Sequence, residues 1–277
     1  MAATTSTTLD DLFANIIAQA RFTAEQQSLM LGLVTPYNIG STPGKTIQIP
    51  KYPSIAAAAL TEGTDMSSTT VSTSSVTVTI AEVGAQVLLT DLARDGHGNP
   101  AIELGTVLGS AIAKKMDQDL LALFDGFSTS LGSAGTEITV ADIFKAVAIL
   151  QNNNAPGSLA AVIHPYTAYQ LKANLTNTFA NPNGGDAQNE AMRSSFVGSL
   201  GGVDIYQSSN LTVDGNDDVK GAVFSREALA IALKRDFQIE TQRDASLRAT
   251  ELNATAVYGV GELDDTYGVE LFFDAAV

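Results

Sequence analysis

The sequence of 277 residues contains no cysteine and no tryptophan, and it contains only two histidines. Without cysteine, a disulfide scaffold, a thiolate metal site and a thiol nucleophile are all excluded. The two histidines, His97 and His164, lie too far apart in the sequence to suggest a histidine-rich metal site. No stretch approaches about 18 uninterrupted apolar residues, so no membrane span is predicted. The N-terminus lacks the basic start and apolar core that are typical of a secretory signal.

Charge is also scarce, and it is mostly of one sign. Charged residues make up 16% of the chain, against about 25% in an average globular protein. The 30 acidic residues outnumber the 15 basic ones, which gives a net charge of -15. Because such a surface repels the phosphate backbone, a protein that reads DNA or RNA sequence is not expected. Hydrophobic residues reach 45%, enough for a substantial core in one large domain or two linked ones. A soluble protein that stays in the cytoplasm or assembles from it is expected.

Two segments come close to known binding motifs, and neither has the required pattern. GSTPGKT at 40–46 has three residues between its glycines where a phosphate-binding loop has four, and an alternating strand follows it where that loop needs a helix. DGNDDVKG at 214–221 resembles a calcium loop but has Val219 in place of the glycine at the sharp turn. No nucleophile elbow, zinc-protease helix or dinucleotide fingerprint is present. The sequence therefore predicts a protein that is not an enzyme and binds no cofactor or metal.

The region from 46 to 90 has an unusual organisation. The segments 46–52 and 71–91 alternate in hydrophobicity and are predicted to be strands. The residues that join them are small or polar, with almost nothing to bury. A long connection of this kind usually has a function, and a two-stranded ribbon needs a surface to lie against. Either the ribbon folds back on its own domain, or it is an arm that packs on a neighbouring subunit.

A long helix is predicted over residues 99–126. Asn99 and Pro100 are favourable residues for its start, and Gly126 suits a left-handed C-terminal position. Charged residues, Asp117 among them, are placed off its apolar stripe. The core-facing side of this helix is predicted to consist of Leu104, Leu108, Ile112, Met116 and Leu120.

Beyond this helix, helical and strand patterns alternate. Helices are predicted at 140–150 and 166–175, and strands at 159–165 and 201–208. The segment AVFSREALAIAL at 222–233 is predicted to begin as a strand and run into a short helix, and the remainder is rich in strands. No internal repeat or clear linker is found, so the fold class is α+β with interleaved parts.

Three segments of the second half carry a resemblance to a known family. They are AAVIHPYTAYQL at 160–171, GSLGGVDIYQSSNL at 198–211, and the stretch from GAVFSREAL to YGVEL at 221–271. With the polar N-terminal arm, the long hairpin and the long helix before them, they resemble the major capsid protein of tailed phages, which has the Hong Kong 97-type capsid fold. The resemblance covers about residues 40–275.

This resemblance implies a division of the chain into parts. Residues 1–45 would be the N-arm and 46–90 the extended β-hairpin loop. The peripheral domain, with its long spine helix, would comprise 91–134 and 236–277, and the axial domain 135–235. The candidate contacts to neighbouring subunits are Lys51, Ile55, Leu60, Glu62, Asp65 and Met66.

The resemblance also implies a function. The chain would assemble with copies of itself into hexamers and pentamers of an icosahedral head, with portal, scaffolding and decoration proteins as further partners. Double-stranded DNA would be enclosed without sequence-specific binding, in the virion after assembly in the host cytoplasm. In some relatives a lysine of the extended loop forms a covalent cross-link; Lys51 lies within the loop and Lys45 just before it, and whether either forms such a link is left open by the sequence.

Three other classes remain open. A cellular compartment that encloses a cargo could have the same fold. A secreted filament protein such as a flagellin has a similar composition, but it needs long heptad helices at both ends, whereas this C-terminus has a strand pattern. A cytoplasmic enzyme would need catalytic residues that the motifs above do not supply.

Overall fold

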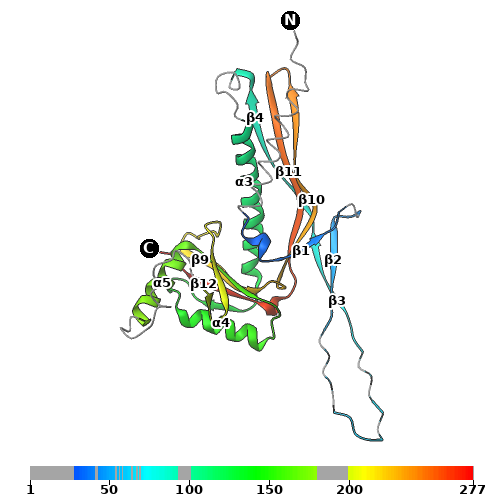
Figure 1. The fold of residues 1–277 in the computed structure, drawn as a ribbon, viewed down its shortest axis with the longest axis vertical. Coiled ribbons are helices and arrows are strands. Elements are labelled where there is room, and N and C mark those ends of the chain that lie inside the picture. Colours follow the sequence, from blue (N-terminus) through cyan, green and yellow to red (C-terminus); the bar gives the residue numbers. More distant parts are fainter. Residues whose placement is uncertain are drawn as a thin grey trace.

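The structure is a computed structural model that describes residues 28–40, 43–53, 70–92, 101–179 and 199–276, with some of the residues between 53 and 70. The described residues form an α+β fold with three sheets, as the sequence predicts (Figure 1). A long four-stranded sheet and a six-stranded sheet make up the body. A two-stranded ribbon projects from the body on the side away from the helices α3 and α4.

The long sheet has the strand order β1-β10-β11-β4 and packs one face on the helix α3 (Ala101–Leu121). Its strands are β1 (Thr35–Asn38), β10 (Leu229–Asp244), β11 (Ala249–Glu262) and β4 (Ala81–Thr90). Inward-facing residues alternate with exposed ones along β4, and β11 supplies Leu252, Ala254 and Ala256 to the same core. Burial of this apolar face, at roughly 25 cal/mol per Å², fixes α3 along the sheet. A short 3-10 turn, η1 (Met30–Gly32), packs against α3 as well.

Two local predictions in this layer are wrong. The short helix expected within 222–233 is the start of the strand β10, because its residues are buried on both faces. Leu229 and Ile231 face the α3 core, while Ala230 and Ala232 face the base of the ribbon. The long helix does not end on a left-handed Gly126: α3 ends at Leu121 and continues as the 3-10 turn η2 (Ala122–Gly126), after which the chain becomes extended. Its predicted start at residues 99–100 lies outside the described residues.

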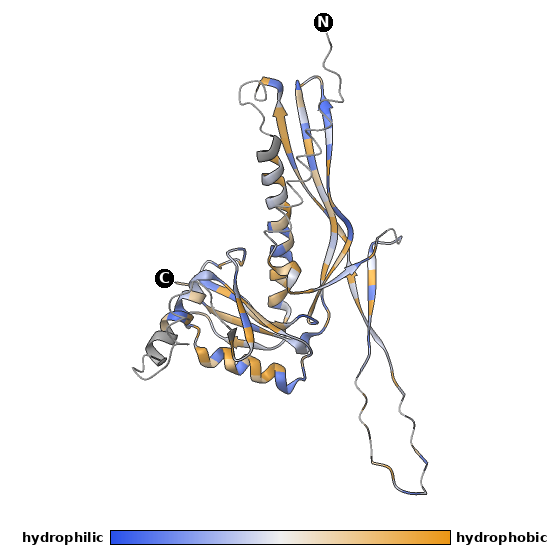
Figure 2. Cartoon of the chain, in the orientation of Figure 1, coloured by the Kyte–Doolittle hydropathy of each residue, from blue (hydrophilic) through white to orange (hydrophobic). Residues whose placement is uncertain are grey.

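The six-stranded sheet has the order β5-β12-β9-β6-β8-β7 and separates two apolar clusters. Along β9, Val223 faces the helices α4 and α5, whereas Ala222 and Phe224 face the end of α3. Figure 2 shows the hydrophobic residues gathered in this sheet and in α4. The elements are β5 (Ser130–Gly132), α4 (Val140–Asn152), β6 (Leu159–Ile163), α5 (Pro165–Phe179), β7 (Ser199–Leu200), β8 (Val203–Gln207), β9 (Asp218–Ser225), η3 (Asp265–Tyr267) and β12 (Gly268–Asp274).

The ribbon consists of β2 (Thr46–Lys51) and β3 (Ser74–Thr79), paired antiparallel, and its base lies across the outer face of the long sheet. Gly259 and Gly261 of β11 make this crossing possible. A Cβ on Gly259 would stand 2.4 Å from the carbonyl oxygen of Thr79, and one on Gly261 would stand 2.7 Å from the side chain of Val78. The two glycines point to the same face of β11 because side chains alternate along a strand. The base of the ribbon is therefore fixed by a close approach of two backbones.

Candidate assembly surface

Beyond its base, the ribbon has no support from the described part of its own chain. Every described residue from Lys51 to Ser75 is exposed. Figure 1 shows the two arms of the ribbon extending well away from both sheets. The apolar residues of this segment are therefore in solvent in a single chain: Tyr52, Ile55, Leu60, Met66 and Val71 are between 42% and 73% exposed.

The charges of the projecting segment are all negative. Glu62 and Asp65 are exposed near its far end, and the chain has no basic residue between Lys51 and Arg94. Of the six candidate contact residues, five therefore lie on the projecting part: Ile55, Leu60, Glu62, Asp65 and Met66. They expose apolar and acidic groups without a cation among them.

The sixth candidate, Lys51, lies where the ribbon leaves the body. Its ammonium nitrogen is 2.5 Å from a carboxylate oxygen of Asp264, in the connection between β11 and η3. Thr266 also donates to Asp264, from its backbone N–H at 3.1 Å and from its hydroxyl at 2.7 Å. Burial of the Asp264 carboxyl raises its pKa, but Lys51 and Thr266 outweigh burial and hold the pKa below its ordinary value. The ion pair ties the end of β2 to the body.

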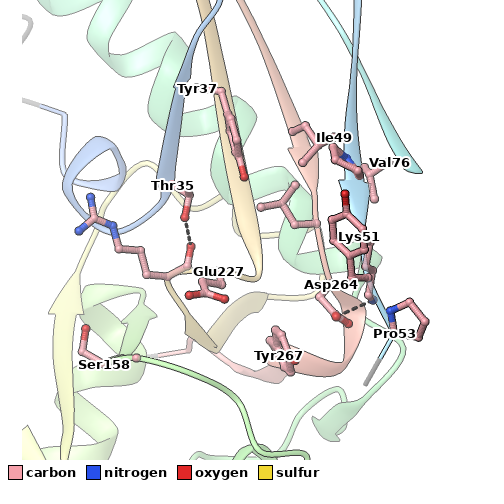
Figure 3. Close-up of a pocket in the computed structure, with 15 residues that line it drawn as sticks. Thr35, Tyr37, Ile49, Lys51, Pro53, Val76, Ser158, Glu227, Asp264 and Tyr267 are labelled. Carbon is pink, nitrogen blue, oxygen red and sulfur yellow. Dashed lines mark hydrogen bonds and ion pairs between the residues drawn. The ribbon is translucent and has the colours of Figure 1, made fainter. Parts of the chain in front are cut away.

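A cavity of about 780 Å³ opens beside this ion pair. Figure 3 shows Tyr37 of β1, Glu227 and Tyr267 directed toward the same space, with Ser158 at its far side. The wall nearest the ribbon is formed by Ile49 and the residues up to Pro53. This cavity could not be predicted from the sequence, because its walls come from segments that are far apart in the chain.

The five residues predicted for the core side of the long helix face the long sheet. Leu108, Ile112 and Leu120 are almost completely buried, and Met116 is buried. Leu104 is partly buried and packs against the same cluster.

The position of Asp117 differs from the one that the sequence predicts. Its place off the apolar side of the helix predicts an exposed side chain, and this prediction is wrong. The structure buries it, with 1% of its surface exposed. Its carboxylate accepts hydrogen bonds from the Ser28 hydroxyl at 2.9 Å, from the backbone N–H groups of Leu29 and Met30 at 3.2 Å each, and from the Asn210 side chain at 3.3 Å. A buried carboxylate requires such donors. Asp117 thus anchors residues 28–30 to the helix α3.

Within the described ranges, three further observations concern alternative functions. No helix there is long and apolar enough to cross a membrane. No three metal-ligating side chains of that part of the chain come together. His164 is mostly buried, and burial lowers the pKa of its imidazole; its Nδ1 accepts a hydrogen bond from the backbone N–H of Tyr166 at 3.3 Å.

The sequence profile of the phage capsid protein family matches residues 53–270, which is most of the chain. The chain belongs to the phage capsid protein family. The match runs from the projecting segment into the last strand, and so it includes most of both sheets of the body but not β1. The resemblance to phage capsid proteins in the sequence is confirmed. A comparison with curated protein sequences finds no significant match.

Solved structures of similar fold include phage capsids and an encapsulin complex. The capsid structure of the cyanophage P-SCSP1u aligns with a TM-score of 0.69 and 19% identity, over 90% of this chain and 89% of that one. The acid-stable capsid of Helicobacter pylori bacteriophage KHP30 aligns with a TM-score of 0.70 and 12% identity, over 89% and 91%. The holo-SrpI encapsulin complex from Synechococcus elongatus aligns with a TM-score of 0.65 and 10% identity, over 90% and 88%. At these identities, the similarity shows a common fold.

Proposed function

We propose that this capsid protein is the major subunit of the icosahedral head of a tailed phage, with the Hong Kong 97-type fold and no catalytic role. In this proposal it assembles into hexamers and pentamers that enclose double-stranded DNA, in the host cytoplasm and then in the virion. Portal, scaffolding and decoration proteins are the further partners. Membership of the capsid family and the shells of similar fold support this proposal.

The observation that carries the proposal is the unsupported ribbon. Fixing a residue's backbone costs roughly 1–2 kcal/mol, and the described residues from Lys51 to Ser75 bury almost nothing within their own chain that would offset this cost. A two-stranded ribbon is marginal in water by itself. A neighbouring copy on which the ribbon lies would cover Leu60 and Met66. The same reasoning supports the assignment of 46–90 to the extended loop.

The division into domains follows from the same proposal. Residues 1–45 serve as the N-arm, 91–134 with 236–277 as the peripheral domain, and 135–235 as the axial domain. The presence of two apolar cores, one beside the long sheet and one beneath the six-stranded sheet, supports a division into two units. The strands do not follow the proposed boundaries throughout, since β5 and β12 lie in 91–134 and 236–277 but pair in the six-stranded sheet, and β10 begins within 135–235 but pairs in the long sheet. The strand β4, at the end of the extended loop, pairs with β11 and so joins the loop to the peripheral sheet.

Deletion of residues 56–68 tests the role of the ribbon. The shortened chain should fold, because no described residue of this segment belongs to a core cluster, yet it should form no shells in electron micrographs. A matched variant that carries a Gly/Ser segment of equal length in place of 56–68 keeps the reach but not the side chains. It should fail in the same way if contacts of the ribbon hold the shell. Normal shells from both variants would contradict the proposal.

A cellular compartment that encloses a protein cargo is the second candidate, favoured by the similarity to the encapsulin complex. Particles purified from the natural source discriminate between the two. The chain has seven tyrosines and no tryptophan, so its own absorbance at 280 nm is weak and enclosed DNA would dominate the spectrum. Nuclease-resistant DNA in the particles supports a phage head, whereas a co-purifying protein cargo without DNA supports a compartment.

A further inference from the structure

The cavity beside Lys51 occupies a distinctive place in the fold. Figure 1 shows the projecting ribbon and the six-stranded part of the body diverging from a common region. The residues that line the cavity come from that region, including Lys51 and Tyr52 of the ribbon and Ser158 and Tyr267 of the body (Figure 3). Tyr52 and Pro53 belong both to its wall and to the exposed segment of the ribbon. The exposed surface of the ribbon and the surface of the cavity are therefore continuous.

The cavity has the chemistry of a protein-binding socket. Tyr37, Ile49 and Leu263 supply apolar surface, and Tyr52 and Tyr267 add two further aromatic rings. The two charged groups beside this surface, Lys51 and Asp264, form an ion pair with one another, as described above. The energetic centres of protein interfaces are pockets of this kind, in which an aromatic or arginine side chain becomes fully desolvated.

Two charges at the rim are available to a partner. The side chains of Arg226 and Glu227 are exposed, and neither forms an ion pair with another described residue. The turn that carries them is held in place, because the Thr35 hydroxyl donates to the carbonyl oxygen of Arg226 at 2.9 Å and the guanidinium Nε donates to the carbonyl of Val34 at 3.3 Å. A cation and an anion on a fixed turn determine the position in which an incoming chain binds, and they contribute less to the strength of binding.

We propose that this cavity is a socket for a second copy of the chain, the same copy on which the ribbon lies. The inference rests on the proposed shell function. A neighbour that supports the ribbon lies between the ribbon and the body, and the residues that line the cavity come from the region where the two diverge. A stable interface buries about 800 Å² on each partner. The ribbon is narrow, and the socket would add a compact area of contact beside it. The inserted side chain has an apolar stem and a polar end, to match the walls and the rim.

A single introduced thiol tests the socket, because the chain has no cysteine of its own. Ser158, exposed and on the wall of the cavity, is replaced by cysteine, and the rate of labelling with a small methanethiosulfonate reagent is measured in isolated subunits and in shells. We expect labelling at least tenfold slower in shells. Ser133→Cys, at an exposed site outside the cavity, reports how far the reagent reaches assembled subunits. Equal rates at Ser158 in the two states overturn the socket.

A bulky substitution gives a second, independent result. Ser158→Trp fills the cavity from an exposed position, so the subunit should stay folded, with an unchanged circular dichroism spectrum, while the yield of shells falls at least tenfold. Ser133→Trp adds the same ring elsewhere and should assemble. Normal assembly of Ser158→Trp, or equal loss in both variants, contradicts the socket. Wild-type protein that forms no shells would instead contradict the proposed function, so the two failures are distinguishable.

Discussion

Replacement of Asp117 by alanine should destabilise the unassembled subunit strongly, although the residue lies on a helix face that the sequence pattern assigns to solvent. The side chain is almost completely buried and accepts four hydrogen bonds, three of them from residues 28–30 and one from Asn210. Each hydrogen bond to a charged group contributes about 1.5–3 kcal/mol net, and the contributions do not add fully. Asp117→Ala leaves several buried donors without an acceptor at about 1–3 kcal/mol each, so a total loss of about 3–5 kcal/mol is expected.

Thermal unfolding of the free subunit, followed by circular dichroism, measures this cost. For a chain of this size 1 kcal/mol corresponds to roughly 2–4 °C in Tm, so a loss of about 3–5 kcal/mol should make Asp117→Ala melt roughly 6–20 °C below the wild type. The amides of Leu29 and Met30, which lose their acceptor, should exchange with solvent much faster. Asp117→Asn retains one carbonyl oxygen and should give an intermediate loss. A Tm within 2 °C of the wild type, with unchanged exchange at these two amides, would refute the anchoring role.

Four further outcomes are expected. Leu120→Ala removes a fully buried side chain and should lower the free energy of unfolding by about 2–5 kcal/mol in chemical denaturation. Lys115→Ala removes an exposed i,i+4 pair with Asp119 and should lower it by less than about 1 kcal/mol. Equal small losses in both variants would show that the apolar side of the helix is misassigned. Gly259→Ala should displace the base of the ribbon, seen as faster amide exchange in β3, and unchanged exchange there would contradict the close crossing. Burial, with repulsion from neighbouring carboxylates, raises the pKa of Glu262, so the ionised carboxylate destabilises the folded state at pH values above the ordinary pKa of glutamate. Glu262→Gln should therefore raise Tm at pH 7 and leave Tm unchanged below about pH 4, where the carboxyl is protonated. A change in Tm that is independent of pH would show that charge is not the cause. Each copy carries a net charge of -15, so copies repel one another, and this repulsion reaches farther at about 0.01 M salt, where the screening length is about 30 Å, than at roughly 0.15 M. Assembly should therefore be faster at the higher salt concentration. Slower assembly at the higher salt concentration would indicate that ion pairs dominate the contacts.

The parts of the fold that follow from local periodicity could be predicted. The apolar residues from Leu108 to Leu120 recur at helical spacing, and the alternation through Val76 and Val78 indicates a strand. Both patterns depend only on near neighbours in the sequence. The exposure of the ribbon could also be predicted from the sequence, because a segment with almost no residues to bury cannot contribute to a core.

The parts that depend on distant partners could not be predicted. Asp117 is buried because its donors lie 87–93 residues away, and no local pattern reveals this. The alanine-rich start of β10 favours a helix by propensity, and only burial between the α3 core and the base of the ribbon makes it a strand. The pairing of Lys51 with Asp264 joins two residues that are far apart in the chain, and no local pattern connects them.

A cryo-electron microscopy reconstruction of the purified, assembled protein tests the central claim most directly. The account predicts a closed icosahedral shell in which the segment from Tyr52 to Val71 lies on a neighbouring subunit, with Leu60 and Met66 buried against that neighbour. Particles in which this segment folds back on its own body, or a protein that remains monomeric at every salt and protein concentration, would contradict it.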